Sequence, residues 1–208
     1  MKESEGRQTT FSGAGSEKIE IGLGGVAETL VLPLWFRAKH NEKQNALLRD
    51  PMASKVISRV DYDFARIDRS MHRISLFGPE LSDLYWVIRA KNFDDAVKEF
   101  MDRHPKAVVV NIGAGLDTAF YRVDNGSIRW YDLDLPDVID LRKRLIPETD
   151  RCTCIAKSVF DFSWFDDIGN PEEGLILLAC GVFWYFGEDD VKLIIRNLAN
   201  RFHGAEIV

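Results

Sequence analysis

The sequence predicts an α/β protein in which a mostly parallel sheet follows a helical N-terminal region. Apolar residues repeat at helical spacing through residues 28–60 and 83–102. After Pro105 the pattern changes to short, nearly continuous apolar runs at residues 107–112, 128–133, 152–156 and 175–179. Helix-like segments at residues 137–145 and 189–202 follow the second and fourth of these runs. Such alternation implies crossover connections, and strands that are apolar on both faces are typical of parallel sheets.

The domain organisation can be predicted from the same changes in pattern. Residues 1–17 are polar and rich in glycine and serine, so we expect a flexible leader. Residues 18–104 are expected to form a helical cap, in which Asp50-Pro51 marks a turn before a second helix. Residues 105–208 are expected to form the sheet core. The last residues, 204–208, look like the opening of a fifth strand with no helix after it.

Composition and charge exclude several classes of protein. The chain has 208 residues, 46% of them hydrophobic and 29% charged, with a formal net charge of −6. This acidic balance argues against a nucleic-acid partner. The longest apolar stretch, residues 175–186, is shorter than the roughly 20 residues that cross a bilayer, and the start lacks the apolar core of a secretory signal. The number of cysteines, three, is odd, which suggests a reducing compartment. Together these observations lead us to expect a cytoplasmic protein without a membrane partner.

A glycine turn follows the first predicted strand. Gly113-Ala-Gly115 comes directly after residues 107–112, and we expect a helix to begin near Leu116. Glycines let a ligand approach the backbone closely, and the start of a helix offers free N–H groups. Thr118 stands where the dinucleotide-binding motif has its third glycine, so the turn is not that motif. A tight turn that binds no ligand is the alternative.

Two acidic residues stand at the end of the second predicted strand. Asp132 and Asp134 alternate with apolar residues, so they share one side of the strand. A carboxylate at this position can accept hydrogen bonds from both hydroxyls of a ribose. The alternatives are a solvated carboxylate and a cap for the segment that starts at Pro136. Together with the glycine turn, the acidic pair favours a ligand that contains adenosine.

Several motifs follow one another in a fixed order from about residue 17 to the end of the chain. They occupy residues 28–34, 48–53, 61–64, 89–95, 109–118 together with Arg122, and 132–137. In this order they resemble the leucine carboxyl methyltransferase family, and its bacterial branch of tetracenomycin-type polyketide-synthesis O-methyltransferases looks most similar. The resemblance implies a Rossmann-like class I methyltransferase fold, a helical N-terminal cap that also serves as a lid over the donor site, and S-adenosylmethionine as cofactor. It also implies that the core lacks its C-terminal strands.

The resemblance implies a role for four residues at the methionine and ribose portions of the donor. Arg89 would pair with the carboxylate of S-adenosylmethionine, which suits a guanidinium group. Gly113 and Gly115 would line the methionine portion, and Asp134 would take the ribose hydroxyls.

Further donor-site positions follow from the resemblance. Ser158 and Val159 would lie near the adenine, and Asp161 is a candidate to replace an acid that family members often carry at position 158. Cys180 stands where the family commonly has glutamate, so this chain lacks one carboxylate at the donor site.

The expected activity is S-adenosylmethionine-dependent O-methylation of a carboxylate or hydroxyl on a small-molecule, polyketide-like acceptor. No residue identifies itself as a catalytic base, so we assign none. One alternative is a truncated, weakly active or inactive binding or assembly module, in which a homodimer covers the exposed sheet edge. A nicotinamide-dependent oxidoreductase is a third hypothesis, disfavoured by the missing glycine.

Two smaller motifs leave choices open. Cys152 and Cys154 have no second pair of cysteines or histidines at ligand spacing, so we interpret them as strand residues and predict no metal site. The aromatic run at residues 183–186 fits either a wall of the acceptor pocket or packing beneath the cap.

Overall fold

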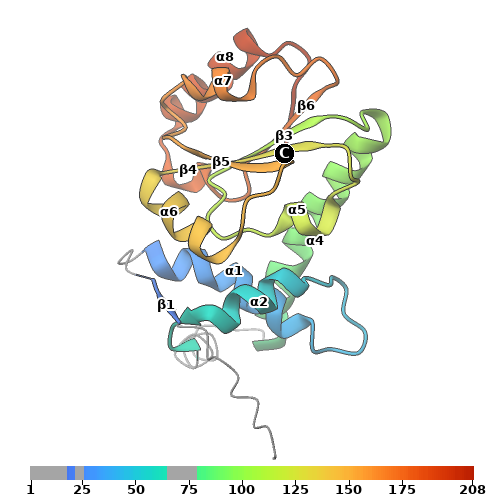
Figure 1. Cartoon of the computed structure of the whole chain (residues 1–208), viewed down its shortest axis with the longest axis vertical. Helices are drawn as coiled ribbons and strands as arrows, with labels where there is room; N and C mark the ends of the chain where they lie inside the picture. The colour runs from blue at the N-terminus through green and yellow to red at the C-terminus, as the bar shows by residue number, and fades with distance from the viewer. Residues whose placement is uncertain (1–17, 22–25, 65–78) are drawn as a thin grey trace, which may run out of the picture.

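The computed structural model describes residues 18–21, 26–64 and 79–208, and its centre is a five-stranded parallel sheet (Figure 1). The strands lie in the order β5-β4-β3-β6-β7, and every neighbouring pair is parallel. They comprise β3 Val108–Ile112, β4 Arg129–Asp134, β5 Cys152–Ala156, β6 Leu175–Leu178 and β7 Glu206–Ile207. The α/β fold class predicted from the sequence is confirmed, and the strand expected at residues 204–208 is present as β7.

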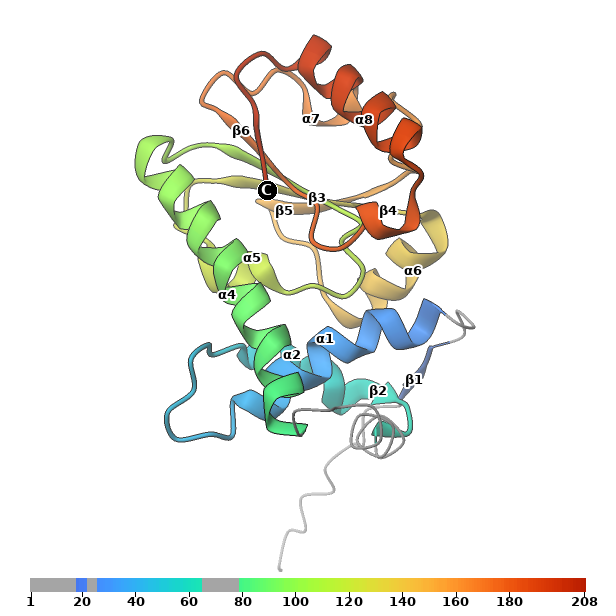
Figure 2. The ribbon, with the colours of Figure 1, turned by 180° about the vertical axis from the view of Figure 1, so that it is seen from behind.

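Helices cover both faces of this sheet (Figure 2). They comprise α1 Val26–His40, α2 Pro51–Arg59, α4 Pro79–Arg103, α5 Ala119–Val123, α6 Pro136–Leu145, α7 Trp164–Ile168 and α8 Glu188–Arg201, with a 3₁₀ turn, η1, at Phe183–Tyr185. The figure shows α7 and α8 on one face and α4, α5 and α6 on the other. Beyond them, α1 packs against α2 and α4 and forms a further helical layer.

The two faces of β3 are buried in different hydrophobic clusters. Val108, Val110 and Ile112 pack in the cluster that contains residues of α7 and α8. Val109 packs in the cluster that contains residues of α4 and α5. Because side chains alternate along a strand, a continuous apolar run is what a central strand covered on both faces requires. The predicted parallel sheet therefore follows directly from these runs.

The helical region differs from its prediction only in detail. Asp50 caps α2 by accepting a hydrogen bond from the Ala53 backbone N–H at 2.9 Å, and Pro51 is the first helical residue, as the Asp50-Pro51 pair predicts. A two-residue parallel pair, β1 Ile19–Glu20 with β2 Val60–Asp61, was not predicted. The predicted leader, residues 1–17, lies outside the described residues. In the described ranges, none of the helices is both long enough and apolar enough to cross a membrane.

The helix expected to begin near Leu116 begins three residues later. A turn at residues 114–117 and the irregular Thr118 precede α5, which starts at Ala119. Side chains hold this turn in place of helical hydrogen bonds. Arg142 donates to the carbonyl oxygens of Gly115 at 3.0 Å and Asp117 at 2.7 Å, and the Asp117 carboxylate accepts from the Thr118 N–H at 2.8 Å. The predicted start was wrong because two of these bonds come from Arg142, which is distant in the sequence.

Candidate functional site

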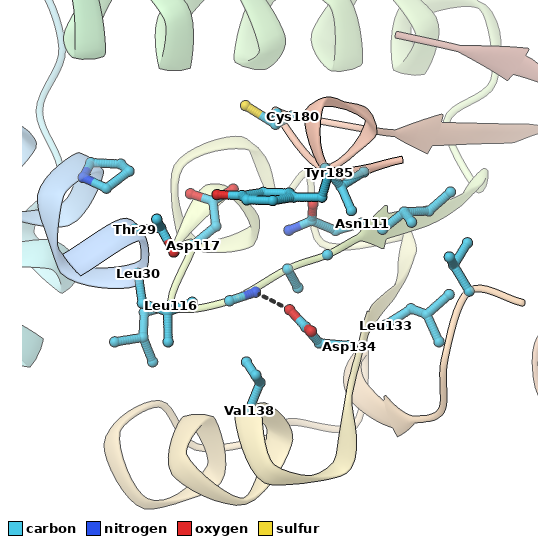
Figure 3. A pocket seen from close by; sticks show the side chains of 18 of the residues that line it. Thr29, Leu30, Asn111, Leu116, Asp117, Leu133, Asp134, Val138, Cys180 and Tyr185 are labelled. Atoms are coloured by element: carbon cyan, nitrogen blue, oxygen red, sulfur yellow. Dashed lines mark hydrogen bonds between the residues drawn. The ribbon is translucent and has the colours of Figure 1, made fainter. Parts of the chain in front are cut away.

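A cavity of about 530 Å³ opens at the carboxyl ends of the central strands, next to α1 and α4 (Figure 3). The order of strands reverses at β3, and ligands of open α/β sheets bind at such a switch point. Seven of the residues that the resemblance assigns to the donor line this one cavity, and the candidate Asp161 does not: Arg89, Gly113, Gly115, Asp134, Ser158, Val159 and Cys180. The fold thus brings together side chains that are up to 91 positions apart in the sequence.

The glycine turn forms one wall of the cavity. Gly113 has a φ of +66° and Gly115 a φ of +48°, backbone conformations that residues other than glycine rarely adopt. A Cβ atom at Gly113 would lie 2.7 Å from Val182 Cγ2, and one at Gly115 would lie 2.8 Å from Leu30 Cδ2. The protein's own packing and the backbone conformation therefore both require glycine here, and they bring bare backbone to the cavity surface.

Asp134 connects the glycine turn to the end of β4. Its Oδ2 accepts a hydrogen bond from the Gly115 N–H at 2.7 Å, which is the dashed line in Figure 3. Its Oδ1 accepts one from the Leu135 N–H at 2.7 Å. Burial raises the pKa of Asp134 above its ordinary value, although these two N–H groups act in the opposite direction. Each carboxylate oxygen has a second lone pair, so Asp134 can still accept two hydrogen bonds from a ligand.

Asp132, the other member of the acidic pair, has a structural role. It is buried and accepts hydrogen bonds from Trp130 Nε1 at 2.9 Å and from Asn111 Nδ2 at 3.2 Å. Arg142 Nη2 lies 2.6 Å from the other oxygen, Asp132 Oδ2. Asp132 therefore orients the guanidinium group that holds the turn after Gly115, and only Asp134 of the pair lines the cavity.

Arg89 lies on the cap side of the cavity. Its guanidinium carbon lies 4.6 Å from the centre of the Trp86 ring, an arrangement that favours a cation. Among the residues that the structure describes, no carboxylate pairs with Arg89. A Cβ atom at Gly181 would lie 3.2 Å from Arg89 Nη1, so the guanidinium group lies close to the turn after β6. A guanidinium group that has no carboxylate partner among the described residues is thus available at this wall.

Five charged side chains form a group in which all but Asp117 are buried, and which we call the cap cluster: Arg37, Asp50, Asp94, Asp117 and Arg122. Arg37 Nε lies 2.8 Å from Asp50 Oδ2, and Arg122 Nη1 lies 2.8 Å from the same oxygen. Arg122 also donates to both oxygens of Asp94, at 2.7 and 2.8 Å. The cluster joins α1, α4 and α5 to the start of α2 and to the turn after Gly115.

Three members of the cap cluster, Arg37, Asp117 and Arg122, line the cavity but were not assigned to it from the sequence. Arg37 and Asp117 are 80 positions apart, and Arg37 Nη2 lies 3.1 Å from Asp117 Oδ1. Asp117 belongs to the motif at residues 109–118, with which Arg122 was grouped, so their place after the glycines was the available signal. Arg37 lies within a helical pattern without a comparable signal.

The residues predicted to lie near the adenine follow the end of β5 and line the cavity there. Ser158 Oγ accepts a hydrogen bond from the Phe160 N–H at 3.2 Å, and Val159 is largely buried. Asp161 does not line the cavity. Its carboxylate accepts a hydrogen bond from the Ser163 N–H at 3.2 Å in an exposed turn, so it does not supply the acid expected beside Ser158.

The aromatic run after β6 divides between the cavity wall and packing on the α7 and α8 face of the sheet, which is not the packing beneath the cap that was the second possibility. Tyr185 and Phe186 line the cavity, and Tyr185 reaches into it in Figure 3. Phe183 and Phe186 pack against the hydrophobic cluster that includes α7 and α8. Trp184 is 91% exposed and does neither.

The three cysteines are free thiols, and the described residues contain no group of three or more side chains placed to hold a metal ion. Burial raises the pKa of Cys154 and of Cys180 to about 11 from an ordinary value of 9.0, and it raises the pKa of Cys152 as well. The thiols therefore stay protonated at neutral pH.

We expect iodoacetamide to label the folded protein at pH 7.5 about 100-fold more slowly than the unfolded chain, because only the thiolate reacts. Intact-mass spectrometry over time, with the protein in denaturant as control, measures this ratio. Equal labelling rates in the two states would contradict the raised pKa values.

The sequence is similar to known methyltransferases. The family model for leucine carboxyl methyltransferase matches residues 31–199. Tetracenomycin polyketide synthesis O-methyltransferase TcmP of Streptomyces glaucescens is 34% identical over 86% of this chain and 64% of its own length. The S-adenosyl-L-methionine-dependent methyltransferase dpfgK of Gibberella zeae is 28% identical over 95% of this chain and 68% of its own.

Among solved structures, magnesium protoporphyrin IX methyltransferase from Synechocystis PCC 6803 with bound SAH is 11% identical, with a TM-score of 0.41 over 74% of this chain and 62% of that chain. This chain spans about two thirds of the length of the two curated relatives, 64% of TcmP and 68% of dpfgK. Because the family model covers most of the sequence, the chain belongs to the leucine carboxyl methyltransferase family.

Proposed function

We propose that this chain binds S-adenosylmethionine and transfers its methyl group to a carboxylate or hydroxyl oxygen of a small-molecule, polyketide-like acceptor. The observation that carries the proposal is the convergence of the glycine turn, Asp134 and Arg89 on one cavity at the switch point of the sheet. The similarity to TcmP supports an acceptor of the polyketide class. When bound, S-adenosylmethionine supplies an electrophilic methyl group on a sulfonium.

The residues present fit this donor at two places. Asp134 keeps a lone pair on each oxygen and lies beside the bare backbone of Gly115, which suits a ribose with two adjacent hydroxyls. Arg89 offers a planar guanidinium group without a carboxylate partner among the described residues, which suits the carboxylate of an amino acid. Ser158 and Val159 lie beyond Asp134 and are assigned to the adenine.

The remaining cavity wall favours an apolar acceptor. Trp86 and Phe93 of α4 face the cavity together with Tyr185 and Phe186. Methyl transfer is an in-line displacement, so the chain's contribution is to hold the two reactants in line and to exclude water. A carboxylate acceptor is already a nucleophile at neutral pH, and no side chain is assigned as a base.

Arg89 provides the first test of the donor site. We expect Arg89→Ala to weaken S-adenosylmethionine binding by about 10- to 100-fold, because a charge-assisted pair contributes roughly 1.5–3 kcal/mol. Isothermal titration calorimetry measures the affinity. Arg129→Ala is the matched control, since Arg129 is exposed and outside the cavity.

Two outcomes of these measurements would contradict the proposal. One is the absence of binding heat for the unsubstituted chain, and the other is equal affinity of the chain and its Arg89→Ala variant. Formation of S-adenosylhomocysteine with a panel of phenols and carboxylic acids then tests turnover. Donor binding without any product would favour a binding module over an enzyme.

A further inference from the structure

One oxygen of the Asp117 carboxylate accepts hydrogen bonds from the described residues, and the other accepts none. Asp117 Oδ1 accepts hydrogen bonds from the Thr118 N–H at 2.8 Å and from Arg37 Nη2 at 3.1 Å, and Arg122 Nη1 lies 3.7 Å away. Within the described part of the chain, no donor contacts Asp117 Oδ2. The side chain is 25% exposed and lines the cavity, where Figure 3 shows its carboxylate.

The charge of the cap cluster is not balanced internally. It contains three carboxylates and two guanidinium groups, so one negative charge remains. Asp94 has both oxygens bound by Arg122, and Asp50 is fully buried between Arg37 and Arg122. The remaining charge is therefore presented to the cavity at Asp117.

Asp117 is ionised at neutral pH. Burial by itself would raise its pKa, but the guanidinium groups of Arg37 and Arg122 and the Thr118 N–H lower the pKa of Asp117 below its ordinary value. A partly buried carboxylate with a free oxygen favours a cationic hydrogen-bond donor, because an unsatisfied charged group costs more than a neutral one.

The free carboxylate oxygen and the unpaired guanidinium group of Arg89 belong to the same end of the cavity. Both act on the Cys180 thiol: after burial, the Asp117 carboxylate raises and the Arg89 guanidinium group lowers the pKa of Cys180. One carboxylate and one guanidinium group that face a common space match the two charges of an α-amino acid, an ammonium and a carboxylate.

From this pairing we propose that Asp117 Oδ2 binds the α-ammonium group of the donor's methionine end while Arg89 binds its carboxylate. The inference rests on the function proposed above and adds a residue to it. Arg37 and Thr118 then act as positioning residues that fix Asp117 Oδ1 and direct Oδ2 to the ligand. The site accordingly selects compounds in which adenosine carries a complete amino acid.

Calorimetry with two ligands tests this assignment. One is S-adenosylhomocysteine, and the other is its deaminated analogue, in which hydrogen replaces the α-amino group. We expect the unsubstituted chain to bind S-adenosylhomocysteine about 10- to 100-fold more tightly than the analogue. Asp117→Asn should lose this preference by weakening only S-adenosylhomocysteine. Asp134→Asn should weaken both ligands alike, because both contain the ribose.

The outcomes separate this inference from the proposed function. If Asp117→Asn weakens both ligands equally, Asp117 only supports the loop, and the inference is overturned while the proposed function stands. Equal affinity of the unsubstituted chain for the two ligands overturns it as well, without relying on any variant. If the unsubstituted chain binds neither S-adenosylmethionine nor S-adenosylhomocysteine, both the inference and the proposed function fail.

Discussion

Replacement of Asp50 by alanine is expected to lower the free energy of unfolding by about 3–5 kcal/mol, the cost typical of removing one partner from a buried ion pair. Asp50 is fully buried, and its Oδ2 lies 2.8 Å from both Arg37 Nε and Arg122 Nη1. The same oxygen accepts a hydrogen bond from Thr118 Oγ1 at 2.6 Å. The substitution therefore leaves two buried guanidinium groups with less negative charge around them and removes the cap of α2.

The cap and the charge can be separated with a second variant. Asp50→Asn keeps an oxygen for the Ala53 N–H, so we expect it to lose about 1 kcal/mol less than Asp50→Ala, the usual contribution of a helix cap. Guanidinium chloride unfolding followed by circular dichroism measures both variants.

A surface ion pair supplies the control for Asp50. The exposed pair Lys91–Asp95 has side chains 44% and 51% exposed, and Asp95→Ala should cost less than about 1 kcal/mol. If Asp50→Ala is no more destabilising than Asp95→Ala, the cap cluster does not hold the helical layer on the sheet.

The strand positions could be predicted because a strand that is buried on both faces appears in the sequence as a short, continuous apolar run. The run predicted at residues 152–156 is β5, and the run at residues 107–112 contains β3 with one residue fewer at its start. Both are short and apolar, and both end where the polar residues or glycines of the cavity begin. A parallel strand needs little beyond such a run and its crossover connections.

Interactions between distant charged residues could not be predicted in the same way. Arg37 and Asp117 are 80 positions apart, and Arg122 and Asp50 are 72 positions apart. Nothing in the local pattern around Arg37 distinguishes a buried ion pair from a solvated helix face. The start of α5 was misplaced for the same reason, because Arg142 and Asp117 hold the preceding turn through contacts that no helix signal contains.

The choice between Asp132 and Asp134 shows where the pattern of residues stops being informative. Both are acids at the end of one strand, and strand alternation alone places them together. The register pairs Asn111 with Asp132 across β3 and β4, and the buried Arg142 adds a salt bridge to Asp132. Asp132 therefore uses its oxygens for contacts that stabilise the fold. Asp134 follows the last apolar residue of β4 and lines the cavity, where a ligand can reach it.

We expect Asp134→Ala to weaken S-adenosylhomocysteine binding by at least about 100-fold, since two hydrogen bonds to a carboxylate contribute roughly 1.5–3 kcal/mol each. The substitution removes the acceptor for the ribose hydroxyls and also frees the Gly115 and Leu135 N–H groups, which now bond to it at 2.7 Å. Asp134→Asn keeps an oxygen for one of these N–H groups, so its loss should be smaller.

The pH dependence of the affinity gives an independent check on Asp134. Binding needs the ionised carboxylate, and burial raises its pKa above the ordinary 3.8. On acidification, the affinity for S-adenosylhomocysteine should therefore begin to fall at a higher pH than an exposed aspartate would give. Calorimetry at a series of pH values measures this midpoint, and Asp134→Asn should lack this component of the pH dependence.

Asp140→Ala is the matched control, because Asp140 lies on the exposed face of α6 and outside the cavity. It should bind S-adenosylhomocysteine as the unsubstituted chain does. Thermal melts of all variants without ligand separate lost affinity from lost folding. A folded Asp134→Ala variant with unchanged affinity would mean that the ribose does not lie at the end of β4, and the placement of the donor in this cavity would have to be abandoned.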